Sequence, residues 1–319
     1  MTTKNACSAA MLALATAFFA LVWTNPSSAA ALEKMPGKPV ILLAGPQGPV
    51  TFIRPPAPTV AQPEAATITV TYTGFPAAAK TAFQRAVNIW KGLLTSSAPI
   101  KISATFTPLG PGVLGSARAN NFWRFSTGAT PDTWYPDALA NKIYGSDIDP
   151  SVDIIAQFSS AYTSWHYGSG PAPAGKIDFT SVVLHEIGHG LGFSGWGYVS
   201  GGKGTVRAAG YPMIYDRYTE NNGGTAMLSF PDSSATLATQ LQSGNLFFDS
   251  AQVRAANANR RAKLYAPAVF QPGSSYSHLD EATFSAGNPN SLMTPYISPG
   301  ETIRSPGAIT LALFRTLGW

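Results

Sequence analysis

The sequence predicts an α+β fold, because strand-like and helix-like hydrophobic patterns follow one another along the chain without an internal repeat. Residues 67–72 and residues 100–106 alternate between apolar and other side chains, which is typical of strands. Between these two runs, Pro76 opens a stretch whose apolar residues recur at spacings of three and four, which predicts a helix. Those apolar residues are Phe83, Val87, Trp90 and Leu94.

Further elements are predicted both before and after Gly192, beyond which the composition of the chain changes. Residues 152–158 form a third strand candidate, followed by a helix that begins near Thr180, with Thr180 or Ser181 as its cap. Residues 195–287 are rich in Gly, Ser and Asn, so we expect a loop-rich region with a helix at about 252–259. Ser305-Pro306 then has the form of a helix start. The helix that it opens would carry Ile309, Leu313, Phe314 and Leu317 on one side.

The first residues are typical of a secretory signal. Lys4 precedes an apolar run at residues 9–22, and small residues follow at 29–31. We therefore expect residues 1–30 to be a signal peptide and the remaining chain to be secreted, extracellular or periplasmic. The single cysteine, Cys7, would leave with that signal, so the mature chain would hold neither a thiol nor a disulfide.

The segment 31–65 is rich in Pro, Ala and Gly and is predicted to be a linker or a pro-segment. We expect ordered structure to begin near Ala66 and to continue as one domain over 66–319. That domain would have an N-terminal subdomain at 66–192 and a C-terminal subdomain at 193–319.

The composition of the chain argues against nucleic acids and membranes as binding partners. Charged residues make up only 12% of the chain and its formal net charge is +5, with no cluster of Lys and Arg. A nucleic-acid-binding surface is therefore not expected. No stretch outside the signal is long and apolar enough for a membrane span, so we expect no stable membrane association once the signal is removed. We expect a monomer.

Two of the four histidines lie four residues apart in the sequence His185-Glu186-Ile187-Gly188-His189. On a helix, this spacing places both imidazoles on one face, where they can chelate a divalent metal such as Zn²⁺. Glu186 lies beside the first histidine and can act as a general base towards water that the metal activates. Gly188, Gly190 and Gly192 weaken the helix, which predicts close backbone contacts or a sharp helix end.

A catalytic zinc needs a third protein ligand and an open position. In the compact motif HExxHxxGxxH the third histidine would fall at position 195, which is Gly195 in this chain. The remaining downstream histidine is His278, which is followed fifteen residues later by Met293 in Leu292-Met293-Thr294-Pro295. Glu220 is an alternative third ligand, as in gluzincin-type peptidases.

These motifs resemble the leishmanolysin-like branch of the metzincin zinc peptidases, over residues 178–193 and 276–296. The resemblance implies a metzincin-like catalytic domain with a twisted mixed sheet, an active-site helix carrying HExxH, and a loop-rich C-terminal subdomain ending in a helix. It also implies one catalytic Zn²⁺ and protein or peptide substrates. The residue roles that it implies are ligation by His185, His189 and His278, general-base catalysis by Glu186, and a methionine turn at Met293.

The chain departs from that branch in two respects. It lacks the cysteines of leishmanolysin, so neither that disulfide framework nor latency based on cysteine can apply. Some metzincins place a tyrosine ligand two residues after the turn methionine, where this chain has Pro295.

The function expected from the sequence is a secreted zinc endopeptidase, with substrate paired along an edge strand at residues 152–158. The alternatives are a gluzincin-type peptidase that uses Glu220 and a non-catalytic extracellular protein stabilised by metal. Two weaker expectations concern acidic residues. Asp280 and Glu281 could orient His278, and an acidic group could bind structural Ca²⁺. That group consists of Asp147, Asp149 and Asp153.

Overall fold

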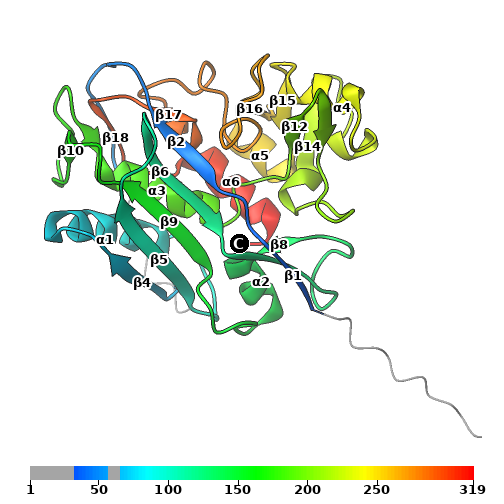
Figure 1. Ribbon diagram of the computed structural model, residues 1–319, viewed down its shortest axis with the longest axis horizontal. Helices are drawn as coiled ribbons and strands as arrows, with labels where there is room; N and C mark the ends of the chain where they lie inside the picture. Colours follow the sequence, from blue (N-terminus) through cyan, green and yellow to red (C-terminus); the bar gives the residue numbers. More distant parts are fainter. Residues whose placement is uncertain (1–31, 57–64) are drawn as a thin grey trace, which may run out of the picture. The chain divides into compact units, whose positions relative to one another are not determined.

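A mixed six-stranded sheet lies at the centre of the computed structural model, which describes residues 32–56 and 65–319. The strand order is β17-β2-β6-β9-β5-β4, and Figure 1 shows the strands side by side. Strands β4, β5 and β9 are parallel to one another, whereas β6 is antiparallel to both of its neighbours. The strands are β2 (Val40–Ala44), β4 (Ile68–Thr73), β5 (Ile100–Thr107), β6 (Val113–Ala119), β9 (Ile154–Ser159) and β17 (Tyr296–Ile297). The structure thus confirms the α+β class and a mixed sheet.

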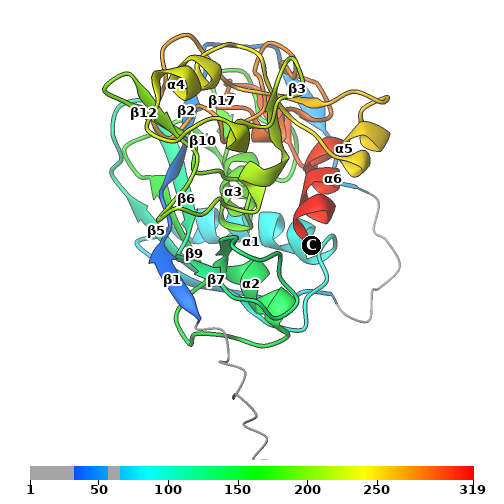
Figure 2. The ribbon, with the colours of Figure 1, turned by 90° about the vertical axis from the view of Figure 1, so that its right-hand side faces the viewer.

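Helices α1 (Ala77–Lys91), α3 (Phe179–Gly190) and α6 (Gly307–Leu317) lie on the same side of this sheet, as Figure 2 shows. The predicted apolar face of α1 is buried, including Trp90. The Trp90 indole Nε1 donates a hydrogen bond to the carbonyl of Leu184, 3.0 Å away, and so joins α1 to α3. Every residue of α3 is buried. This helix is therefore held in the interior between the sheet and its neighbouring helices.

The predicted strand at 152–158 forms β9, but the expectation that it lies at the sheet edge is wrong. β9 pairs with β5 on one side and with β6 on the other. Both sets of its backbone hydrogen-bonding groups are therefore used within the sheet, and β9 has no free edge for a peptide. Its continuous apolar run, Ile154-Ile155-Ala156, fits this central position.

The prediction that ordered structure begins near Ala66 is also wrong. Residues 32–319 cluster as one compact unit, and the segment before residue 57 contributes three strands to it. β1 (Glu33–Pro36) pairs with β7 (Asn121–Arg124), β2 pairs with β6 and β17, and β3 (Thr51–Ile53) pairs with β18 (Glu301–Ile303). Pro and Gly separate the three short strands, which explains why the composition of this segment is typical of a linker.

The C-terminal half is built from short elements, as predicted, and ends in α6. The predicted helix at 252–259 is α5 (Ala251–Ala256), whereas α2 and α4 were not predicted. The remaining elements are β7 (Asn121–Arg124), β8 (Tyr135–Pro136), α2 (Asp137–Tyr144), β10 (Trp165–His166), β11 (Ile177–Asp178), β12 (Tyr198–Ser200), β13 (Lys203–Thr205), η1 (Tyr215–Tyr218), β14 (Thr219–Asn221), η2 (Met227–Ser229), α4 (Ala235–Leu241), β15 (Leu246–Phe248), β16 (Ala262–Leu264), η3 (Ser291–Met293) and β18 (Glu301–Ile303).

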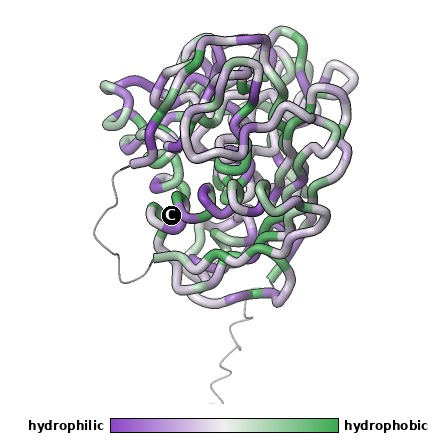
Figure 3. Tube along the Cα trace, turned by 90° about the vertical axis from the view of Figure 1, so that its left-hand side faces the viewer, coloured by the Kyte–Doolittle hydropathy of each residue, from purple (hydrophilic) through white to green (hydrophobic). Residues whose placement is uncertain are grey.

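The trace in Figure 3 changes repeatedly between hydrophobic and hydrophilic, as expected for elements with one buried side. Among the described residues, no helix has the length and apolar character that a membrane span requires. The predicted signal peptide, residues 1–30, lies outside the described residues.

Candidate metal centre

Three buried histidines, His185, His189 and His278, bring their imidazole rings together. The Nε2 atom of His189 lies 2.9 Å from Nε2 of His185 and 3.2 Å from Nε2 of His278. The third side of this triangle, between His185 and His278, measures 3.3 Å. The structure therefore assembles the three residues that the resemblance implied as ligands, although 89 positions separate His189 from His278.

The other nitrogen of each ring faces a backbone carbonyl. Nδ1 lies 2.6 Å from the Leu292 oxygen for His185, 2.7 Å from the Phe193 oxygen for His189, and 2.7 Å from the Ser274 oxygen for His278. A carbonyl only accepts hydrogen bonds, so Nδ1 is the protonated nitrogen in each ring and Nε2 carries a lone pair. Three acceptors that face one another cannot hydrogen-bond to each other.

This arrangement fits a divalent metal ion. With Zn–N distances of 2.0–2.1 Å and tetrahedral angles, ligand nitrogens are about 3.3 Å apart, close to the observed spacings. Burial lowers the pKa of His185 to about 4. Burial, together with neighbouring imidazoles, lowers the pKa of His189 and of His278 well below the usual value. The rings are thus held neutral, which is the form that binds a metal.

Glu186 is also fully buried, and its two carboxylate oxygens have no hydrogen-bond partner among the described residues. Burial raises the pKa of Glu186 well above its usual value, and the backbone N–H of Leu42 on β2, which lies near the carboxylate without meeting the geometry of a hydrogen bond, lowers it in part. The carboxylate lies against Gly115 on β6, where an added Cβ atom would approach Oε1 to 2.6 Å. Burying a carboxylate without a hydrogen-bond partner raises the free energy of the folded protein. We therefore expect a water molecule or another polar ligand to bind this group.

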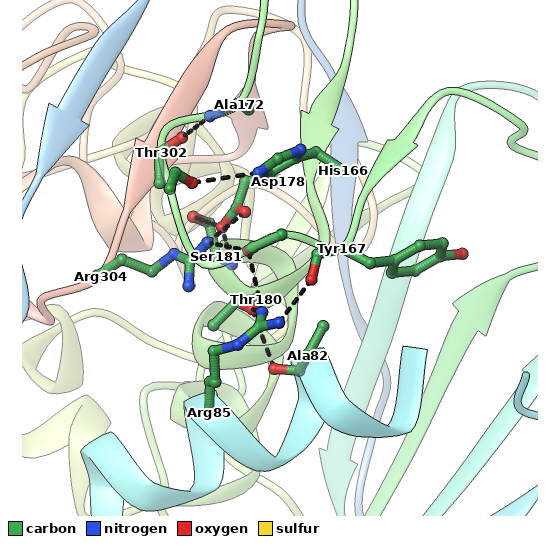
Figure 4. Close-up of polar contacts among 12 residues, drawn as sticks. Ala82, Arg85, His166, Tyr167, Ala172, Asp178, Thr180, Ser181, Thr302 and Arg304 are labelled. Carbon is green, nitrogen blue, oxygen red and sulfur yellow. Dashed lines mark hydrogen bonds and ion pairs between the residues drawn. The ribbon is translucent and has the colours of Figure 1, made fainter. Parts of the chain in front are cut away.

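A buried polar network holds the beginning of α3 (Figure 4). The cap of the helix is Asp178, not the predicted Thr180 or Ser181, and its carboxylate accepts hydrogen bonds from the backbone N–H and the hydroxyl of Ser181. Arg304 lies 2.6 Å from the same carboxylate, and both side chains are buried. From α1, Arg85 donates to the Thr180 hydroxyl. The network therefore fixes the helix that carries two of the three histidines.

The glycines of α3 allow the close contacts that the sequence predicted. An added Cβ at Gly188 would lie 2.9 Å from Sδ of Met293, and one at Gly190 would lie 2.4 Å from the Ile154 side chain on β9. Gly192 has a φ of +120°, which ends the helix sharply. Met293 is fully buried against the helix that carries His185 and His189.

A buried network that sequence reasoning missed supports His278. Tyr276, two residues earlier, has a φ of +74° and a fully buried side chain. Its hydroxyl donates to Asp216, 2.9 Å away, and lies 2.8 Å from the Thr219 hydroxyl. The ring also fills the space beside Gly195, where an added Cβ would lie 2.3 Å from it. Position 195 therefore has no room for a histidine side chain. No local sequence pattern predicts the contact between the Tyr276 ring and Gly195.

Other predicted residues do not join the centre. Glu220 forms an ion pair with Arg261, 2.7 Å away, so the structure favours His278 over Glu220 as the third ligand. The prediction that Asp280 and Glu281 orient His278 is wrong, because the His278 Nδ1 forms its hydrogen bond with the carbonyl of Ser274. The fourth histidine, His166, faces the carbonyl of Gly170.

The acidic residues proposed for calcium have protein partners instead. Asp147 pairs with Lys101 at 2.6 Å and Asp149 with Lys34 at 2.8 Å. Asp153 accepts hydrogen bonds from the backbone N–H of Lys101 and from the Asn141 amide. Because these cations and amide donors satisfy the three carboxylates, the geometry offers no support for a calcium site there.

A cavity of about 310 Å³ lies beside the centre. One wall is formed by residues 38–41, which lead into and begin β2, and the opposite wall includes Ser194, Gly195 and Ser277. Lys38 lies on this wall with its Nζ 3.5 Å from the centroid of the Trp196 ring. The cavity therefore reaches the loops that follow His189 and precede His278.

Comparison of the chain with models of known protein families and with curated proteins finds no match.

Proposed function

We propose that this chain is a secreted zinc-dependent endopeptidase of the leishmanolysin-like metzincin type. The observation that carries the proposal is the convergence of three Nε2 lone pairs, with Glu186, whose buried carboxylate has no hydrogen-bond partner, directly after His185 in the same helix. A zinc ion held by His185, His189 and His278 would polarise a peptide carbonyl and acidify a water molecule.

Within this site, Glu186 would act as the proton carrier. Its carboxylate would take a proton from water as that water attacks the scissile carbonyl, and would then pass the proton to the leaving amine. The high pKa that burial gives Glu186 favours the first of these transfers, because a more basic carboxylate is a stronger acceptor for the proton of water. The three Nδ1 contacts to carbonyls would keep the imidazoles oriented throughout.

Two observations set this proposal apart from its alternatives. A structural zinc is enclosed by four protein ligands, whereas the described residues bring together three histidines, and the buried carboxylate of the neighbouring Glu186 has no hydrogen-bond partner. This disfavours a metal-stabilised binding protein. A gluzincin-type site would need Glu220 in place of His278, and Glu220 instead pairs with Arg261.

The test compares Glu186→Gln with Glu220→Gln, a matched change outside the centre. Each protein is loaded with zinc, its metal content is measured, and hydrolysis of an unfolded protein substrate is followed. We expect Glu186→Gln to keep one zinc per chain and to lose about 10²–10⁴-fold in turnover, the usual worth of a general base. Glu220→Gln should retain both properties. Equal turnover in Glu186→Gln and the unaltered chain would contradict the proposed role.

A further inference from the structure

Strand β2 lies directly over the centre. It pairs antiparallel with β6, and the register places Leu42 opposite Gly115, the residue that contacts the Glu186 carboxylate. Figure 1 shows β2 alongside β6 in front of α3. The exposed fraction is at most 1% for each of the three histidines and zero for Glu186. In this arrangement no peptide bond can reach the site.

The contacts of β2 are those of an extended peptide in a groove. The N–H of Ile41 donates to the carbonyl of Gly273 and that of Leu43 to Pro295, while the N–H of Ala44 donates to Gly112 on the opposite side. One wall of the groove is therefore β6, and the other wall is the chain around Gly273 and Pro295 that flanks His278 and Met293. Strand addition of this kind is a common way for proteins to bind peptides, with alternate side chains entering pockets.

The side chains of β2 alternate in the same manner. Val40 and Leu42 are buried, while Ile41 and Leu43 are half-buried. Residues 32–56 contain neither histidine nor cysteine, and Glu33, their only acidic residue, pairs with Arg124. The segment thus closes the centre by occupying space and backbone hydrogen bonds, without supplying a metal ligand.

We propose that β2 occupies the substrate groove of its own chain, and that hydrolysis begins only after β2 leaves β6. This inference rests on the proposed function, and it identifies β6, instead of β9, as the strand that a peptide substrate would pair with. The substrate would be an extended segment whose inward side chains replace Val40 and Leu42, which are both apolar. The full chain should therefore turn over substrate slowly, at a rate set by the small fraction of molecules in which β2 has left β6.

A reversible disulfide tests whether β2 must move. Ile41 and Ser116 are opposite each other in the register, and the Ile41 N–H points to Gly273 and away from β6. They therefore form a non-hydrogen-bonded pair, whose Cα separation of about 4.5 Å is compatible with a disulfide. The variant is Ile41→Cys/Ser116→Cys in a Cys7→Ser chain. The matched control, Ser116→Cys/Gln157→Cys, links β6 to β9 and leaves β2 free.

The first readout does not depend on peptidase activity. Zinc is loaded, and its removal by a chromogenic chelator is timed. We expect the oxidised 41–116 variant to release zinc at least tenfold more slowly than its reduced form, whereas the 116–157 control should release zinc at the same rate in both states. Equal rates in the oxidised and reduced 41–116 variant would overturn the inference.

A second variant weakens the contact of β2 with the domain. Val40 is buried opposite Ala117 and away from the Glu186 contact, so Val40→Asp should drive β2 out of the groove. We expect at least tenfold faster zinc release and at least tenfold higher turnover of an unfolded protein substrate. Adding the oxidised 41–116 disulfide to Val40→Asp should restore the slow release. If Val40→Asp sped up zinc release by weakening the whole domain, a single disulfide between β2 and β6 would not restore slow release. If Val40→Asp fails to fold, the redox pair alone decides.

The two proposals fail in different ways. If every variant lacks turnover while zinc release still follows the state of β2, the peptidase proposal fails and the coverage by β2 stands. If turnover is present in the oxidised 41–116 variant at the level of its reduced form, the peptidase proposal stands and self-occupation of the groove is refuted.

Discussion

Gly115 on β6 lies directly against Glu186 on α3, and an added Cβ atom at position 115 would approach Oε1 to 2.6 Å and Cγ to 2.9 Å. Gly115 does not have a positive φ, so its role is to leave space and not to permit an unusual backbone conformation. The contact links the proposed substrate strand to the proposed general base.

The first prediction is that Gly115→Ala displaces the Glu186 carboxylate. A displacement of about 1 Å can cost on the order of 100-fold in rate, so we expect a 10- to 100-fold loss of turnover with unchanged zinc content. Ser116→Ala, on the opposite face of the same strand, serves as the control and should keep its activity. Unchanged turnover in Gly115→Ala would mean that the carboxylate has room to move without loss of function.

His278→Ala should abolish tight zinc binding, because the centre then retains only the two histidines of α3. The loss should exceed the roughly 10- to 100-fold that removal of an outer hydrogen bond costs. Glu220→Ala should bind zinc as the unaltered chain does, since Glu220 pairs with Arg261. Isothermal titration with zinc measures both affinities. The reverse ranking would reinstate the gluzincin-type site.

Tyr276→Phe should loosen the loop that presents His278. The change removes the hydroxyl that donates to buried Asp216, which leaves an acceptor short of one partner. We expect the free energy of unfolding to fall by about 1–3 kcal/mol and zinc affinity to fall about tenfold. Tyr265→Phe, which removes a hydroxyl bonded to Gln271 in a less buried place, is the control. A stability loss with unaltered zinc affinity would show that Tyr276 does not position His278.

Arg304→Met should leave the buried carboxylate of Asp178 without its cation (Figure 4). Breaking a buried pair from one side costs about 3–5 kcal/mol, so we expect a loss of this size in urea denaturation. Adding Asp178→Asn removes the uncompensated charge and should recover part of the loss. If the double variant is less stable than Arg304→Met alone, the cap that Asp178 gives α3 outweighs its charge.

Stability should depend on pH through Asp153. Burial raises the pKa of Asp153 to about 7, with Asp137 and Asp147 adding to the increase and Lys101 opposing it. The folded state therefore binds a proton more tightly than the unfolded state, so stability is lost as pH rises from about 4 to about 7. Asp153→Asn stays neutral and should lack this component. The difference between the two proteins, measured by urea denaturation at both pH values, should reach up to about 4 kcal/mol. A constant difference would contradict the raised pKa.

Features that depend on residues close together in the chain could be predicted from the sequence alone. The spacing of His185 and His189 fixed two imidazoles on one helical face, and the periodicity around Trp90 located α1, because helix geometry repeats within a few residues. The alternating runs likewise located β4 and β5. Gly192 marked the end of α3 for the same local reason.

Which distant segments meet could be read only from the folded structure. It selected His278 over Glu220, placed β9 inside the sheet and inserted β2 between β6 and β17. Strand pairing uses backbone groups that nearly every residue carries, so a Pro- and Gly-rich segment can pair without a strong sequence signal. The paths of the loops and the packing of side chains such as Tyr276 select which pairings form. Neither can be inferred from a local sequence pattern.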